Sequence, residues 1–321
     1  MRTSIWHRTG SVLVSALVVA GVAAIGPAAT AAPVTINLCA VAGTVALPGA
    51  ASVPIWGFAR VATPGDCTGA TATLPGPLLT VDQDATVTLN VTNALPGSRA
   101  VHVDIPGISF DPGEVEAGSG DTVTINFTAG RPGTYLYQSS GDAGRQTAMG
   151  LYGALLVRPT TAGQAYNDAA TAYTREAVLV LSALDPAFNA DPDGADLNDY
   201  LATYWMINGK SYPGTDAITA GAGERLLLRY VNAGFDHTTM TLLGTHEHVV
   251  ARDAELLPAA FDAVSETIPA GATEDAIVTM PGTPPPVASG FALFNRQLHL
   301  TNGTVSGPTP TPGGMMTFIH P

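Results

Sequence analysis

The sequence of 321 residues has little positive charge. Its 13 Lys and Arg stand against 26 Asp and Glu, so the formal net charge is −13. Lys210 is the only lysine, and the arginines beyond the N-terminal segment are scattered singly. Nucleic-acid phosphates and anionic membrane surfaces are bound by clustered Lys and Arg. The composition therefore excludes nucleic acid and anionic membranes as partners.

Sequence patterns of several enzyme classes are also missing. No Rossmann fingerprint, no Walker loop and no Gly-x-Ser-x-Gly elbow occurs. The carboxylates Asp104, Asp111 and Glu114 lie near one another and could perform acid/base work, but they neighbour Pro-Gly pairs. We interpret them as turn residues. No catalytic residue is assigned.

Long apolar runs are absent beyond the N-terminus, where residues 1–32 have the layout of a secretory signal peptide. Arg2 and Arg8 precede an apolar run at 11–25, and small residues follow at 29–32. An uncleaved N-terminal anchor is the alternative. No later stretch reaches about 18 uninterrupted apolar residues. We therefore predict a secreted or extracytoplasmic protein without a stable membrane span after signal cleavage.

Cysteine is scarce, since Cys39 and Cys67 are the only two. An even pair in an exported protein predicts a disulfide. Chain-entropy arguments give such a bond roughly 3 to 4 kcal/mol of stabilisation. A catalytic or metal-binding role is the alternative, although no Cys-x-x-Cys motif occurs.

Two segments, 86–92 and 122–128, alternate polar and apolar residues with the apolar residues at odd positions. A period of two predicts strands that bury one face. Pro-Gly pairs punctuate this region, which is typical of a β-sandwich or barrel. The predicted fold class is therefore all-β.

A second β-rich series begins at residue 176, after a break with a short helical turn at 169–174. Within this series we predict one strand over residues 240–252 and another over residues 291–300. The predicted organisation is a signal peptide at 1–32, a first domain at 33–160, a linker at 161–174 and a second domain at 175–321.

Several blocks resemble the multicopper oxidase (laccase-like) family. The blocks are 74–81, 86–93, 133–137 and 149–157 for its first domain, and 204–209, 229–234 and 312–319 for a later one. The resemblance implies two tandem plastocyanin-like cupredoxin domains, each a Greek-key sandwich or barrel. It also implies copper-dependent oxidation of phenols, metals or similar donors by oxygen.

The copper-ligand motifs of that family are largely missing. Family members hold copper with paired His-x-His motifs and a blue site of two His and one Cys. Gln138-Ser139-Ser140 stands where a His-x-His would follow Tyr137, and His102-Val103-Asp104 keeps one imidazole of the earlier motif. Phe294-Asn295-Arg296-Gln297 replaces Phe-His-Cys-His, while the methionine segment Gly314-Met315-Met316 survives.

Other histidines are candidate metal ligands. His246 and His248, at i and i+2 of the predicted strand, project to one face and could chelate copper or zinc with His237. His102 with Asp104 is a further candidate. Surface histidines at a strand end are the alternative. No cofactor is firmly indicated, and copper remains the candidate.

Two functions stay open. The first, favoured function is that of an exported protein that has lost its copper centres and acts as a binding or structural module rather than as an enzyme. The alternative is a copper-binding oxidoreductase that uses a residual histidine site. The protein or small-molecule partner is not identified, and the family resemblance implies a homotrimer.

Overall fold

The structure is a computed structural model that describes residues 31–49, 52–303 and 312–321. The predicted signal peptide, apart from its last two residues, lies outside the described residues. No helix within the described ranges is long and apolar enough to cross a membrane.

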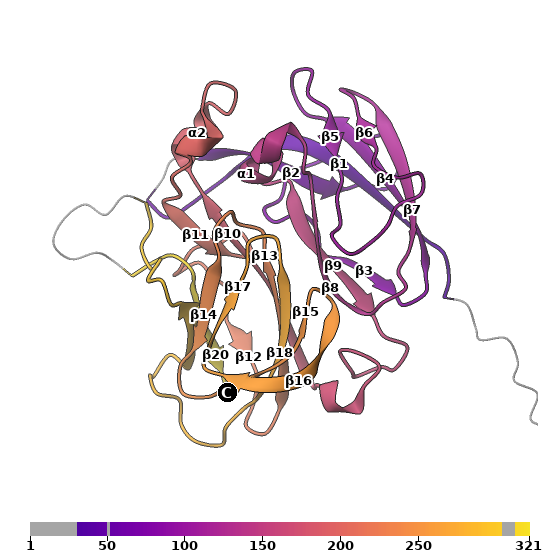
Figure 1. Cartoon of the computed structure of the whole chain (residues 1–321). Coiled ribbons are helices and arrows are strands. Elements are labelled where there is room, and N and C mark those ends of the chain that lie inside the picture. The colour runs from indigo at the N-terminus through magenta and orange to yellow at the C-terminus, as the bar shows by residue number, and fades with distance from the viewer. Residues whose placement is uncertain (1–30, 50–51, 304–311) are drawn as a thin grey trace, which may run out of the picture. The chain divides into compact units, whose positions relative to one another are not determined.

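The strands before residue 160 form a four-stranded sheet in the order β2-β1-β4-β7, a three-stranded sheet in the order β3-β9-β8, and the pair β5-β6 (Figure 1). The strands are β1 (Val34–Val45), β2 (Val53–Arg60), β3 (Leu79–Asp82), β4 (Thr86–Ala94), β5 (Val101–His102), β6 (Glu116–Ala117), β7 (Thr122–Thr128), β8 (Gly133–Gln138) and β9 (Tyr152–Arg158). A short helical segment, η1 (Asp142–Gly144) and α1 (Arg145–Met149), joins β8 to β9.

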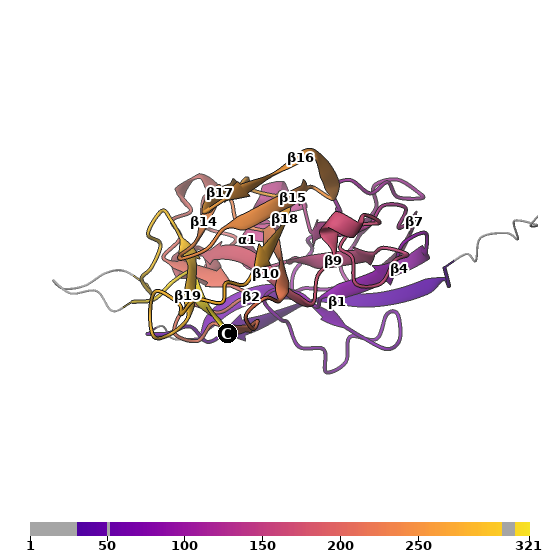
Figure 2. The same ribbon diagram turned by 90° about the horizontal axis from the view of Figure 1, so that it is seen from below.

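The later strands form a six-stranded sheet, β11-β10-β13-β18-β15-β16, and a five-stranded sheet, β12-β20-β19-β14-β17. They are β10 (Arg175–Leu184), β11 (Tyr204–Ile207), β12 (Ile218–Thr219), β13 (Arg225–Asn232), β14 (Thr238–Leu242), β15 (Glu247–Arg252), β16 (Glu255–Ala263), β17 (Ser265–Ile268), β18 (Thr273–Thr279), β19 (Phe291–Asn295) and β20 (Met316–His320). Figure 2 shows β16 along the outer edge of the six-stranded sheet. Three short helices, η2 (Ala169–Thr171), α2 (Pro186–Ala190) and η3 (Leu197–Asp199), lie in the connections.

Each half repeats one pairing scheme. β1 runs parallel to β4, as β10 does to β13. A second parallel pair, β3 with β9, is matched by β12 with β20. Parallel neighbouring strands need crossover connections. In both halves the chain therefore crosses from one sheet to the other and does not form a simple meander. The predicted all-β fold of two sandwiches is confirmed, whereas the boundaries at 160 and 175 stay predictions because 31–321 is one compact unit.

The alternating segments form strands with the predicted inward face. β4 and β7 are antiparallel neighbours, and Leu89 lies opposite Ile125. Val87, Leu89 and Val91 are buried, as are Ile125 and Phe127. The odd-numbered apolar residues therefore build the core of the first sandwich, as the period of two requires.

The prediction of one strand at 240–252 is wrong. β14 ends at Leu242 in the five-stranded sheet, and β15 begins at Glu247 in the six-stranded sheet. Gly244, with φ +97°, turns the chain from one sheet to the other. The predicted strand at 291–300 is likewise shorter, since β19 ends at Asn295.

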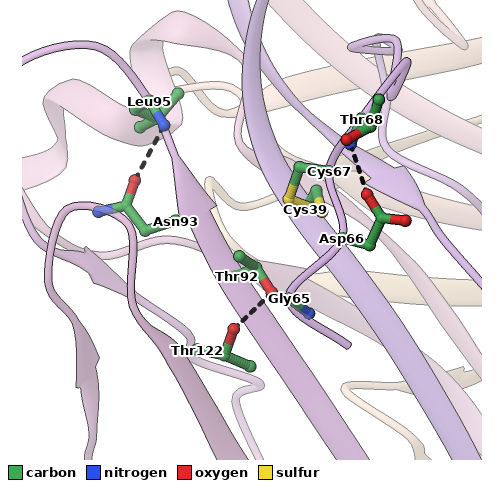
Figure 3. The surroundings of a disulfide bond; sticks show 9 residues. All are labelled: Cys39, Gly65, Asp66, Cys67, Thr68, Thr92, Asn93, Leu95 and Thr122. Atoms are coloured by element: carbon green, nitrogen blue, oxygen red, sulfur yellow. Dashed lines mark hydrogen bonds between the residues drawn. A yellow bond between two sulfur atoms is a disulfide. The ribbon is translucent and has the colours of Figure 1, made fainter. Parts of the chain in front are cut away.

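The predicted disulfide is confirmed. Cys39 on β1 is bonded to Cys67 in the loop after β2, with a Cα–Cα distance of 5.8 Å (Figure 3). The same loop is tied to β4 because the Gly65 amide donates to the Thr92 hydroxyl at 3.1 Å. The bond therefore anchors an irregular loop of Pro and Gly onto the first sheet.

Apolar clusters join the two halves. One unites Val41 and Ile55 of the first sandwich with Leu184 and Met206 of the second. Another unites Leu136, Tyr152 and Ala154 with Val180, Val231 and Ala233. Burial of this shared apolar surface stabilises one arrangement of the two halves.

A buried charge network lies at the same junction. The fully buried guanidinium of Arg229 on β13 donates to Asp275 on β18 at 2.9 Å and to Thr134 on β8 at 2.9 Å. Its Nε donates to Glu176 on β10 at 2.7 Å. Glu176 also accepts two hydrogen bonds from Arg158 at 2.6 and 2.7 Å. Residues from both halves thus share one ionic network.

Replacing Arg229 by Met is expected to lower the free energy of unfolding by about 3 to 5 kcal/mol, because Asp275 would remain buried without its cation. Urea unfolding of the purified protein measures this loss. The matched control is Arg175→Met, whose exposed pair with Glu224 spans 3.0 Å. That change should cost less than about 1 kcal/mol. Equal losses for the two variants would contradict a special role for Arg229.

Candidate functional site

The loop after β8 occupies the position where the multicopper oxidase pattern calls for His-x-His. Ser139 is fully buried, and its hydroxyl is hydrogen-bonded to the side-chain oxygen of the equally buried Gln146 on α1. The Gln146 amide donates to the Ala100 carbonyl at 2.6 Å, and Thr147 donates to the Ser139 carbonyl at 2.8 Å. These neutral side chains are occupied by one another and by backbone carbonyls, and none is a thiolate or an imidazole.

The segment with His102 and Asp104 lies beside this loop. Asp104 and Gln138 exchange two backbone hydrogen bonds of 2.9 Å. The imidazole of His102, on β5, contacts the Glu116 carboxylate on the neighbouring β6. The structure thus brings together the two segments of the first sandwich that the resemblance aligned with ligand positions, and the His102 ring is paired with the Glu116 carboxylate.

The second predicted ligand position lies at the end of β19. Asn295 is buried, and its amide nitrogen lies 3.7 Å from the sulfur of the buried Met315. The side chain of Gln297 accepts from the Thr239 amide at 3.0 Å and donates to the His237 carbonyl at 2.7 Å. An amide therefore faces the surviving methionine, and Gln297 ties the chain to the start of β14.

The three histidines proposed as ligands lie in two places. His246 and His248 are exposed on either side of the buried Glu247, and His246 lies just before β15. They line a surface cavity of about 610 Å³ with Asp262, and His248 Nδ1 lies 2.7 Å from the Asp262 carboxylate. His237 lies before β14, and its ring accepts a hydrogen bond from the Ala270 amide at 3.2 Å.

The donor set does not fit a blue copper centre. Both cysteines of the chain are in the disulfide, so no thiolate is available. Within residues 31–49, 52–303 and 312–321, no three His, Cys, Asp or Glu side chains converge on a point that could hold a metal ion. The assignments of His237, His246, His248, His102 and Asp104 as metal ligands stay predictions.

A buried acidic cluster lies inside the second sandwich and was missed from the sequence. Tyr230 donates to Glu247 at 2.6 Å, and Arg252 donates to Glu274 at 2.9 Å and to Glu266 at 2.7 Å. One oxygen of Glu247 and one of Glu274 are buried without a hydrogen-bond partner. Glu274 and Glu266 therefore share one arginine, whereas the Glu247 carboxylate is hydrogen-bonded, within the described ranges, only to Tyr230.

Protonation is how this cluster avoids buried negative charge. Burial is the main cause that raises the pKa of Glu247 to about 8; the negative charges of Glu274 and Glu266 act in the same direction, and the hydrogen bond from Tyr230 opposes them. Burial likewise raises the pKa of Glu274 to about 7, although Arg252 opposes the shift. In the sequence, Glu247 stands between two histidines, and nothing in that pattern indicates that its side chain is buried.

Comparisons with known proteins agree with the architecture. Residues 60–162 match the family model described as multicopper oxidase. Multicopper oxidase MmcO of Mycobacterium tuberculosis is 24% identical over 282 residues, which cover 74% of this chain and 53% of the relative. Copper resistance protein A of Escherichia coli is 34% identical over 119 residues, 34% of this chain and 18% of the relative.

A solved structure, the blue copper oxidase from Nitrosomonas europaea, superposes with a TM-score of 0.75 at 22% identity, covering 90% of this chain and 85% of that one. The resemblance to the multicopper oxidases and the tandem cupredoxin fold are thereby confirmed. The chain spans about half the length of the multicopper oxidase it matches.

The acidic cluster predicts stability that falls with rising pH. Glu247 titrates near 4.5 when unfolded and near 8 when folded, so its contribution is complete below pH 4.5 and is lost as the pH rises toward 8. The free energy of unfolding should fall by up to about 1.4 kcal/mol per pH unit for this group. Urea unfolding at a series of pH values from about 5 to about 9 measures this decline in the free energy of unfolding.

In Glu247→Gln, which has no proton to release, this decline should be much smaller. Glu255→Gln is the control, because Glu255 is exposed and paired with Arg131. A decline of the same slope in wild type and Glu247→Gln would show that the acidic cluster does not hold the proton.

Proposed function

We propose that this multicopper-oxidase-like chain has lost its copper centres and acts as an exported binding or structural module. One observation carries the proposal: the chain's only two cysteines are bonded to each other. A blue copper site needs a cysteine thiolate to receive and pass on electrons. Without it, the oxidase mechanism has no entry point for electrons from a donor.

The replacement residues support the same conclusion. Ser139 and Gln146 satisfy each other inside the first sandwich, and Asn295 lies against the sulfur of Met315 inside the second. Neutral hydroxyl and amide groups in these contacts are poor ligands for copper, which favours imidazole and thiolate. These contacts at the expected ligand positions support the loss of the copper centres.

Export and assembly belong to the proposal as well. Export rests on the signal-like segment at 1–32. A homotrimer rests on the family resemblance alone, and light scattering of the secreted protein tests it. Mass spectrometry of that protein would locate the cleavage point.

A second candidate function rests on the histidine cavity. The contact of His248 Nδ1 with Asp262 leaves Nε2 as the nitrogen free to bind a metal, an orientation that carboxylates impose on many metal-binding histidines. With His246 on the same face, this surface would hold Cu(II) through two imidazoles. It would make the chain a copper-binding member of the family.

The copper content separates the two candidates. After loading with Cu(II) and dialysis against a weak chelator, elemental analysis should find well below one copper per chain. Electron paramagnetic resonance of the same sample should show no bound Cu(II). His246→Ala/His248→Ala should behave like wild type.

About one copper per chain with a nitrogen-rich spectrum, lost in the double variant, would support the second candidate instead. Blue absorption or several coppers per chain would contradict both.

A further inference from the structure

A surface cavity of about 340 Å³ is lined by residues of the second half of the chain. Three aromatic residues line it: Tyr200 follows η3, Trp205 lies on β11, and Phe235 lies between β13 and β14. Asp236 and His299 complete the polar part of the lining.

The aromatic rings stand as walls at right angles. Tyr200 and Phe235 meet at 85°, with ring centroids 5.4 Å apart. The Trp205 ring stacks on the imidazole of His299 at 4.2 Å and 13°. Because rings of different orientation line the same surface cavity, a ligand in it can contact more than one π system.

These walls are held by buried groups. The Tyr200 hydroxyl donates to the Ala183 carbonyl at 3.0 Å, and its ring packs edge-on against the buried Phe188. The amide of Leu201 donates at 2.9 Å to Asp185, a buried carboxylate that also caps α2. The Tyr200 wall is therefore pre-organised by its hydrogen bond and by packing against Phe188.

The charge of the cavity is negative. Asp236 is exposed, and among the described residues it forms no ion pair. Burial lowers the pKa of His299, so its imidazole is neutral at neutral pH. The Phe235 side chain stays 43% exposed, which leaves apolar π surface open to solvent beside the carboxylate.

We propose that Tyr200, Trp205, Phe235 and Asp236 form an aromatic cage that binds a small quaternary ammonium cation. Aromatic faces attract an alkylated ammonium through cation–π interaction, and a neighbouring carboxylate adds Coulomb attraction. A neutral aromatic ligand would leave the carboxylate unused, and an anion would be repelled by it. The inference deepens the proposed function, because it names a ligand class for a copper-free binding module.

Choline is the probe, and the fluorescence of Trp205 is the signal. Trp56, in contrast, is buried beneath the guanidinium of Arg99, at 4.4 Å from its ring. Titration with choline chloride at constant ionic strength should change the emission saturably. The uncharged isostere 3,3-dimethylbutan-1-ol should bind at least about 10-fold more weakly.

Two variants test the cage directly. Asp236→Asn and Phe235→Leu should each weaken choline binding by about 5-fold or more, with unchanged thermal unfolding. Asp199→Asn is the matched control, because it removes one exposed carboxylate on the nearby η3 without changing the lining. Its affinity should stay within about twofold of wild type, since screened surface charges contribute little.

Equal binding of choline and its isostere, or no saturable signal, would overturn the cage. Equal weakening by Asp199→Asn and Asp236→Asn would reduce it to general attraction to an acidic protein. Copper analysis of the same preparation separates the two proposals. A preparation that binds both copper and choline would contradict only the loss of the copper centres. A preparation that binds neither copper nor choline would contradict only the cage.

Discussion

The guanidinium of Arg229 is fully buried where the two halves of the chain meet, and the arrangement of the halves depends on it. Its partners come from β8, β10 and β18. A buried cation is tolerated only where carboxylates and hydroxyls surround it, so any shift of one half against the other would expose or orphan the charge. The apolar clusters favour contact between the halves, and Arg229 selects one geometry for that contact.

On β13, the residue after Arg229 points to the opposite face of the sheet. Arg229 points toward the first sandwich, while Tyr230 points into the core of the second and donates to Glu247. This alternation is the period of two that defines a strand. The Arg229 network on one face of β13 therefore links the two halves, and the Tyr230–Glu247 pair on the other face lies within the second half.

Local patterns were enough to predict the strands, because Val87, Leu89 and Ile125 alternate with polar residues whatever their partners are. They were not enough at 240–252, where the side-chain pattern continues while the backbone turns at Gly244 into another sheet. The Arg229 network was invisible for a different reason. Thr134, Glu176 and Asp275 are far from Arg229 in sequence, and only sheet pairing brings them together. Likewise, nothing in the sequence distinguishes the buried Glu247 from the exposed histidines beside it.

The missing copper ligands could be read from the sequence, but their structural consequence could not. Ser139 with Gln146 and Asn295 with Met315 form contacts that leave few donors or acceptors free. Fold alone does not assign function. Where interior groups satisfy one another, as at these two positions, a ligand must be bound by groups that are still free. On the surface of the second sandwich, the Asp236 carboxylate beside the exposed ring of Phe235 is such a group.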